Sequence, residues 1–227
     1  MLKTSSALHF RPAKYVIMEL DGTIIDTRAL MNDIVSEYLK KFNKTLSPEM
    51  ATQIMGRITE DLYDVLKAEY KINHTYQEFK RQMTTLKEKY LQNVQLMAGA
   101  ESLVSWFYER DIPTALVTSC TGKEFEKKTV SCEDLIKKFH HVTTRDDIDR
   151  GKPYPDIFII CASQFIQPPK PQDVLVFEGT VAGAEAARSA GMQVVLVGPC
   201  FTEAEKRKAT QAIDNLCLFD ADEFGLS

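Results

Sequence analysis

The chain has 227 residues, of which 44% are apolar and 26% are charged, and its formal net charge is −4. This composition supplies a substantial core, and the length allows one large domain or a core with a smaller insertion. A mild negative charge without a strongly basic block argues against a nucleic-acid polymer as partner. Three lysines interleaved with glutamates are interpreted as a solvent-exposed helix face: Lys123, Lys127 and Lys128.

Cysteine usage and hydropathy argue against disulfide-stabilised, metal-binding and membrane-spanning classes of protein. The five cysteines are scattered and include no Cys-x-x-Cys pair, which argues against a disulfide framework and a zinc site. The four histidines show no metal-ligand spacing. No apolar run approaches the roughly 18 residues that a membrane helix needs, so no membrane association is expected. These patterns predict reduced thiols and a cytoplasmic protein.

The N-terminal part begins with one strand and continues as helix. The apolar run at residues 15–18 predicts a buried strand, and Asp21-Gly22-Thr23 predicts a tight loop after it. The next apolar residues recur every four positions, as on one face of a helix: Leu30, Ile34, Tyr38 and Phe42. Ser47-Pro48 and the capping box over residues 75–78 mark two further helix starts. Residues 28–95 are therefore expected to be nearly all helical.

The remaining chain alternates strands with helices. Apolar, β-branched runs at residues 112–117, 174–177 and 194–197 predict buried parallel strands covered on both faces. The segment 182–190 reads as a helix that ends at Gly191, and a capping box at residues 202–205 opens a late helix.

This pattern predicts an α/β fold with a doubly wound parallel sheet. Residues 12–27 and 95–227 would form the core domain, and residues 28–94 an inserted helical domain. Ligands bind open α/β sheets beyond the carboxyl ends of the strands. The loops at residues 19–23, 118–119 and 178–179 are therefore expected at one sheet edge.

Four segments resemble the signature motifs of the haloacid-dehalogenase (HAD) family of hydrolases, in the family's order and over essentially the whole chain. The first resembles D-x-D-G-T, and the others resemble the second, third and fourth motifs: Glu19-Leu20-Asp21-Gly22-Thr23, Val117-Thr118-Ser119, Gly151-Lys152-Pro153 and Phe177-Glu178-Gly179-Thr180. Further segments, such as Asp156-Ile157-Phe158 and Gly191-Met192-Gln193, are similar to the pseudouridine-5′-phosphatase branch of that family. The resemblance implies a Rossmann-like core with a helical C1 cap.

The resemblance also implies a chemistry. A carboxylate attacks phosphorus, a second acid serves the leaving alcohol and then water, and Mg²⁺ offsets the repulsion between nucleophile and phosphate. By resemblance, Glu19 stands at the nucleophile position and Asp21 at the general acid/base. Glu19, Asp21 and Glu178 would hold Mg²⁺. The phosphate-binding positions are Gly22, Thr23, Thr118, Ser119 and Lys152, and the implied ligand is a small phosphorylated metabolite.

Two positions depart from the family pattern. The nucleophile position holds Glu19 instead of aspartate, and Gly179 replaces the direct magnesium ligand of the fourth motif. We therefore expect a pseudophosphatase that retains a phosphate pocket, with weakened Mg²⁺ binding. The loss of an acid should leave Lys152 less compensated and favour anion binding without metal. The alternative is an active Mg²⁺-dependent phosphatase for a small phosphate monoester such as a nucleotide.

Several residues stay open between a functional and a structural role. Arg57 could meet an anionic substrate or be an ordinary exposed arginine. Asp146 and Asp147 could replace the lost metal ligand, although a solvated turn is the simpler interpretation. Asp26 is interpreted as a structural hydrogen-bonding residue, and Cys120 as a thiol close to the pocket.

Overall fold

The computed structural model describes residues 10–226, apart from residues 55–58 and 92–93. The chain divides into two compact units. The core unit runs up to Ile25 and resumes at Leu96, and the helical unit comprises Asp26–Gln95. Among the helices in these described stretches, none is both long and apolar enough to cross a membrane.

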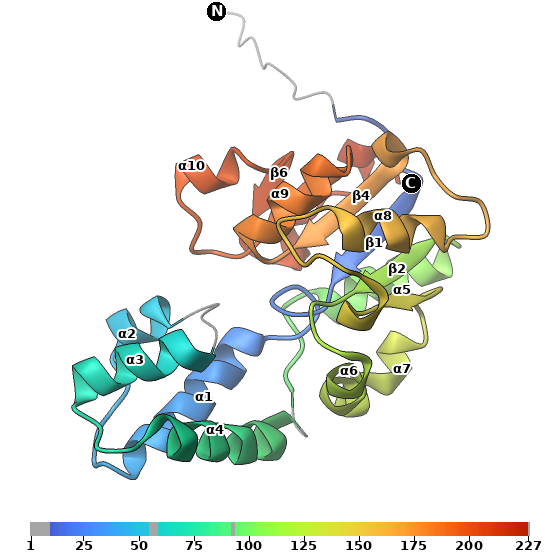
Figure 1. Ribbon diagram of the computed structural model, residues 1–227. Helices are drawn as coiled ribbons and strands as arrows, with labels where there is room; N and C mark the ends of the chain where they lie inside the picture. Colours follow the sequence, from blue (N-terminus) through green and yellow to red (C-terminus); the bar gives the residue numbers. More distant parts are fainter. Residues whose placement is uncertain (1–9, 55–58, 92–93, 227) are drawn as a thin grey trace, which may run out of the picture. The chain divides into compact units, whose positions relative to one another are not determined.

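The core unit is built on a sheet of six strands that are all parallel to their neighbours (Figure 1). In chain order the strands are β1 (Tyr15–Glu19), β2 (Thr114–Val117), β3 (Val142–Thr143), β4 (Val174–Glu178), β5 (Gln193–Val197) and β6 (Gln211–Ile213). Their spatial order is β3-β2-β1-β4-β5-β6. Because β1 lies between β2 and β4, the strand order reverses beside it, and this is where ligands bind in such sheets.

The strand predictions are confirmed for the long strands and incomplete for the short ones. β2 begins at Thr114 and not at residue 112, because Pro113 accepts a hydrogen bond from Val16 N but has no N–H to donate. β3 and β6 were not predicted. They contain two and three residues, too few for a periodic signal.

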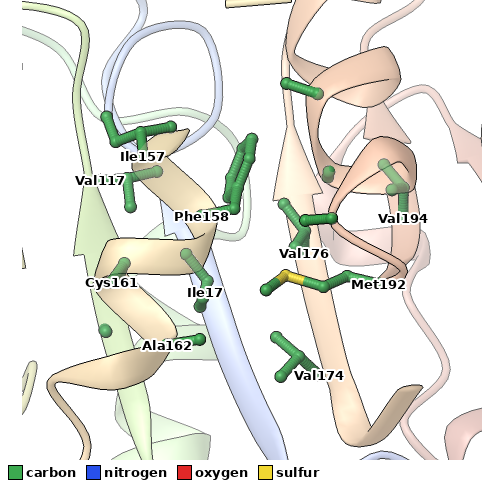
Figure 2. Packing of buried hydrophobic residues seen from close by; sticks show 14 of the residues in the cluster. Ile17, Val117, Ile157, Phe158, Cys161, Ala162, Val174, Val176, Met192 and Val194 are labelled. Carbon is green, nitrogen blue, oxygen red and sulfur yellow. The ribbon is translucent and has the colours of Figure 1, made fainter. Parts of the chain in front are cut away.

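Helices cover both faces of the sheet, which confirms the doubly wound fold. The core-unit helices are α5 (Ala100–Glu109), α6 (Gly122–Thr129), α7 (Glu133–Ile136), α8 (Asp156–Ser163), α9 (Val181–Ser189) and α10 (Glu203–Lys206). On one face, Ile17 and Val176 pack with Phe158 of α8 and with the alanines of α9 (Figure 2). On the other face, the Phe177 ring lies 6.0 Å from that of Phe107 in α5.

The helical unit has its own apolar core. It contains α1 (Thr27–Lys40), α2 (Pro48–Gln53), α3 (Thr59–Tyr70) and α4 (Tyr76–Tyr90). Ile34 and Tyr38 of the predicted stripe are buried in it, and the Tyr38 ring lies 5.2 Å from that of Phe79. The predicted capping box at Thr75 is present at the start of α4.

Candidate functional site

The central strand β1 ends in a buried acid and a tight loop. Glu19 closes the strand with 3% of its surface exposed. Leu20 N then donates to Val117 O at 2.9 Å, which ties the start of the loop to β2. Gly22 has φ +75°, a conformation that favours glycine, and its N–H donates to Ile25 O at 2.9 Å. The Gly22 amide is therefore already used within the loop.

The strands on either side of β1 bring two further motif residues to the same edge. Val117 is in register with Glu19, and Thr118 follows it directly. On the other side Phe177 is in register with Met18, and Glu178 follows. Thr118 and Glu178 are both fully buried. Parallel register thus gathers the loops after β1, β2 and β4, as the sequence predicts.

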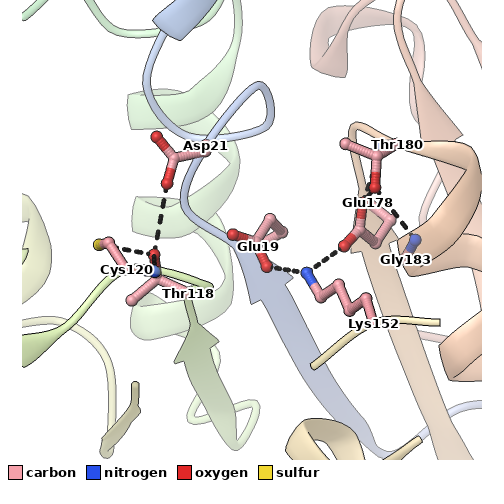
Figure 3. Close-up of polar contacts among 8 residues, drawn as sticks. All are labelled: Glu19, Asp21, Thr118, Cys120, Lys152, Glu178, Thr180 and Gly183. Atoms are coloured by element: carbon pink, nitrogen blue, oxygen red, sulfur yellow. Dashed lines mark hydrogen bonds and ion pairs between the residues drawn. The ribbon is translucent and has the colours of Figure 1, made fainter. Parts of the chain in front are cut away.

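Lys152 joins the acids of two strands. Its ammonium group makes ion pairs with Glu19 and with Glu178, and the three side chains are 9%, 4% and 0% exposed (Figure 3). The other oxygen of Glu178 accepts hydrogen bonds from Thr180 N at 2.8 Å and Thr180 Oγ1 at 2.9 Å. Lys152 is therefore more compensated than the sequence indicated, and the expectation of an under-neutralised lysine is wrong.

This buried triplet carries one excess negative charge, which governs its protonation. Burial raises the pKa of Glu19 to about 7 against the opposing effect of Lys152, and the Glu178 and Asp21 carboxylates add to the rise. Burial of Lys152 opposes its charge, but the carboxylates of Glu178 and Glu19 outweigh this effect and raise its pKa. The excess negative charge therefore favours the protonated forms of both the Glu19 carboxyl group and the Lys152 amine.

Asp21 belongs to a second group at the same edge. Thr118 Oγ1 donates to Asp21 Oδ2 at 3.3 Å and contacts Cys120 Sγ at 2.9 Å (Figure 3). Lys128 of α6 donates to the other oxygen, Asp21 Oδ1, at 2.7 Å. The interpretation of Lys128 as part of a solvated helix face is therefore wrong. Cys120 does lie beside Thr118, but burial raises the pKa of its thiol, which disfavours the reactive thiolate.

The loop after β4 leaves no space for a side chain at Gly179. A Cβ atom there would lie 2.7 Å from the carbonyl oxygen of Gly22 and 2.9 Å from its carbonyl carbon. The backbones of the first and fourth motifs are therefore in direct contact. A ligand side chain at this position would require the Gly22 loop to shift.

These residues do not fit a bound Mg²⁺ ion. Each predicted metal ligand, Glu19, Asp21 and Glu178, already pairs with a lysine of the chain. Gly179 has no side chain that could supply an oxygen ligand, and a larger residue at this position would collide with Gly22. Within the described part of the chain, no group of three or more His, Cys, Asp or Glu residues is arranged to hold a metal ion.

The remaining predicted residues have varied placements. Ser119 is exposed beside Thr118, whereas Thr23 is fully buried, and its Oγ1 has no hydrogen-bond partner among the described residues. Arg57 lies outside the described residues, so its role stays a prediction. Asp26 caps α1 by accepting from Arg28 N and Ala29 N, which confirms a structural role.

Asp146 and Asp147 are used by local structure. Asp146 Oδ2 accepts from Gly122 N at 2.8 Å, at the start of α6. Asp147 Oδ2 accepts from Thr144 N at 2.7 Å. One carboxylate oxygen of each aspartate is thus used by local structure, and the segment interpreted as a solvated turn is a short 3-10 helix over Arg145–Asp147.

The sequence prediction missed three residues of the site. Lys128 was missed because its helix carries lysines at several positions and the pattern does not show which one turns inward. Thr180 and Gly183 were missed because they contact the Glu178 carboxylate from the turn that follows β4. Gly183 leaves the space that the Glu178 carboxylate fills, since a Cβ there would lie 1.8 Å from Glu178 Oε1. A glycine in the first turn of an alanine-rich helix was the available signal.

Known proteins are similar to this chain in sequence and in fold. Residues 16–197 match the family model "haloacid dehalogenase-like hydrolase". A Drosophila melanogaster protein named "probable pseudouridine-5′-phosphatase" is 35% identical over 220 residues, covering 95% of each chain. The (DL)-glycerol-3-phosphatase 2 of Arabidopsis thaliana is 30% identical and covers 93% of this chain and 91% of its own.

A solved structure agrees at the level of the fold. The crystal structure of a HAD family hydrolase from Deinococcus radiodurans superposes with a TM-score of 0.79 at 19% identity, over 91% of this chain and 93% of that one. The motif order, the six-stranded parallel sheet and the family match lead to one assignment. The chain belongs to the haloacid dehalogenase-like hydrolase family and resembles its pseudouridine-5′-phosphatases.

Proposed function

We propose that this protein binds a small phosphorylated metabolite of the nucleotide class and hydrolyses it weakly or not at all. The ligand class is supported by the similarity to a protein named as a probable pseudouridine-5′-phosphatase. The resemblance to this family implies a direct Mg²⁺ ligand at position 179, where this chain has glycine. The observation that carries the loss of turnover is the backbone contact between Gly179 and Gly22, which leaves no room for an acidic side chain.

The nucleophile position adds a second impairment. Glutamate is one methylene longer than aspartate, which moves the attacking oxygens by about 1 Å, and a misplacement of this size costs on the order of a hundredfold. Glu19 is also held in the ion pair with Lys152. Phosphate-monoester hydrolysis needs accelerations of up to ~10²¹-fold, so a partly assembled site is a poor catalyst.

Ligand binding has to compete with the chain's own acids. The site contains three carboxylates and two ammonium groups, which leaves one excess negative charge when all are ionised. An incoming phosphate must draw Lys152 away from Glu19 or Glu178. At the same edge the exposed hydroxyl of Ser119 is a neutral donor, whereas the hydroxyl of Thr118 already donates to Asp21. We therefore expect binding that is weak and limited by the competing carboxylates.

A binding experiment tests the pocket directly. Pseudouridine 5′-phosphate and inorganic phosphate would be titrated into the native chain, Glu19→Gln and Lys152→Met by calorimetry. Glu19→Gln removes one competing charge and should tighten binding about tenfold, which corresponds to about 1.4 kcal/mol. Lys152→Met should abolish binding. Equal affinities in all three chains would contradict the proposed pocket.

A turnover experiment tests the impairment. Phosphate release from an aryl phosphate and from pseudouridine 5′-phosphate would be measured with Mg²⁺ for the native chain, Glu19→Asp, Gly179→Asp and the double variant. We expect release by the native chain at or barely above the blank rate, and clearly faster release by the double variant. Stability is measured in parallel, because Gly179→Asp forces the Gly22 loop to move. Efficient release by the native chain would overturn the proposal.

A further inference from the structure

Lys128 reaches into the site from a helix that no signature motif includes. Its Nζ lies 2.7 Å from Asp21 Oδ1, and the two side chains are 18% and 27% exposed. The second oxygen of Asp21 accepts from Thr118 Oγ1 at 3.3 Å. Both carboxylate oxygens of the acid/base position are therefore bound by groups of the chain itself.

Capping contacts hold the start of α6 and thereby determine which side of the helix, and which lysine, faces the site. Thr121 and Glu124 form a capping box there, and Asp146 accepts from Gly122 N. On this short helix Lys123 is exposed, whereas Lys128, in the last turn, is partly buried against Asp21. The helix thus presents one particular lysine to the site, which distinguishes Lys128 from its neighbours.

The two lysines divide the acids of the site between them. Lys128 pairs with Asp21, and Lys152 pairs with Glu19 and Glu178. A divalent cation would have to displace Lys128 to reach Asp21 Oδ1, and Lys152 to reach Glu19 Oε2 or Glu178 Oε1. It would also lack a ligand from Gly179, where the backbone packs against Gly22. Hard cations such as Mg²⁺ depend on a sufficient number of such oxygen ligands.

We propose that Lys128 is a positioning residue that neutralises and orients Asp21 as an internal counter-cation, so that this acid site is held together without a divalent cation. The inference does not depend on the proposed function. It concerns what balances Asp21 in the free protein, whether or not a metabolite is bound or hydrolysed. It also gives α6 a role that the signature motifs do not describe.

Metal binding and stability test this role in the full chain. The native protein, Lys128→Met, Lys128→Arg and the exposed control Lys123→Met would be titrated with Mn²⁺, followed by its electron paramagnetic resonance signal. Melting temperatures would be recorded in EDTA and in 10 mM Mg²⁺. A ligand that binds only the folded state must raise the melting temperature, so the two readouts report on the same binding.

We expect no melting-temperature rise with Mg²⁺ for the native chain or Lys123→Met. Lys128→Met should melt lower in EDTA, recover part of the loss in Mg²⁺ and bind Mn²⁺ at least tenfold more tightly than native, because Asp21 is released. Lys128→Arg should behave as native. A purely structural lysine would not change the Mn²⁺ affinity, so equal affinities for native and Lys128→Met would overturn the proposal.

The native titration keeps the proposal testable if Lys128→Met does not fold. Submillimolar Mn²⁺ binding by the native chain that is lost in Asp21→Asn would show that Asp21 already serves a metal, and this result would refute the internal counter-cation. Absence of such binding in the native chain, together with native-like behaviour of Lys128→Arg, would support it.

Discussion

Gly183 shows how closely the chain packs around the buried carboxylate of Glu178. An alanine Cβ at this position would lie 1.8 Å from Glu178 Oε1, so the carboxylate would have to leave its hydrogen bonds with Thr180 and Lys152. A glycine-to-alanine change within a helix usually stabilises by up to ~1 kcal/mol. Here we expect the opposite sign, with a loss of about 1–3 kcal/mol from overpacking. Urea unfolding followed by circular dichroism measures it.

Gly151 provides the matched control for this glycine. A Cβ at Gly151 would meet nothing within 4 Å, although the residue precedes the same Lys152. Gly151→Ala should therefore leave the free energy of unfolding within about 0.5 kcal/mol of native. Equal free energies of unfolding for Gly183→Ala and Gly151→Ala would contradict the tight packing of Gly183 against Glu178.

At the residue scale, the positions of the motif residues were predictable and their pairings were not. Parallel strands bring their carboxyl ends to one edge, which is why Glu19, Thr118 and Glu178 could be expected together. The partner of Asp21 depends on which side of α6 faces inward, and the lysine-rich sequence of that helix leaves this undecided. The contact between Gly179 and Gly22 depends on two loops whose conformations carry no periodic signal.

At the scale of elements, the contact between Asp146 and the start of α6 gives a stability prediction. Its carboxylate accepts from Gly122 N at 2.8 Å, and negative charge at a helix N-terminus is favourable. We expect Asp146→Ala to lower the free energy of unfolding by about 1 kcal/mol, as the loss of a capping interaction does. The exposed Asp149→Ala is the control. The native chain is expected not to bind submillimolar Mn²⁺, so both variants should give the same titration as native. Native Mn²⁺ binding that is lost only in Asp146→Ala would restore the idea of a replacement metal ligand.

His141 links the segment before β3 to α8 and predicts a pH dependence. Its Nε2 donates to Cys161 O at 2.8 Å, and its ring lies 4.6 Å from that of Phe165. Burial lowers the pKa of His141, so the unfolded chain takes up a proton more readily than the folded one. This contribution to stability is complete above the unfolded-state pKa of about 6.5 and is lost as the pH falls toward the lower folded value.

Unfolding at a series of pH values measures this effect. Between about pH 7.5 and 5.5 the native chain should lose more unfolding free energy than His141→Gln does, because the variant has no imidazole to protonate. Parallel pH profiles for the two chains would show that His141 does not titrate differently in the folded state.

Elements with their own local signals were predicted well, and those fixed by tertiary contacts were not. The capping boxes at Thr75 and Thr202 mark the starts of α4 and α10 as expected. β3 is defined by its pairing with β2, in which Val142 and Thr143 match Leu116 and Val117. Two residues cannot show an alternating pattern, so such an edge strand exists only through its neighbour.

At the scale of the whole molecule, two separate cores share one chain. Ile25 and Leu96 form an isolated bridge within the core unit, and Asp26 N donates to Gln95 O at 2.8 Å within the helical unit. The two crossings of the chain between the units thus lie side by side. Each unit buries its own large aromatic side chains, such as Phe158 in one and Phe79 in the other. Separate cores allow the units to unfold with different free energies.

Phe79→Ala tests this independence. Phe79 is 1% exposed and contacts the rings of Tyr38 and Tyr63, so its removal should cost the helical unit about 3–5 kcal/mol. Trp106, the single tryptophan, belongs to the core unit and reports on that unit alone. In the variant we expect helix content to fall at lower urea than Trp106 emission changes, whereas Phe158→Ala should shift the emission transition. Coincident transitions by both probes in Phe79→Ala would mean that the two cores unfold as one cooperative unit.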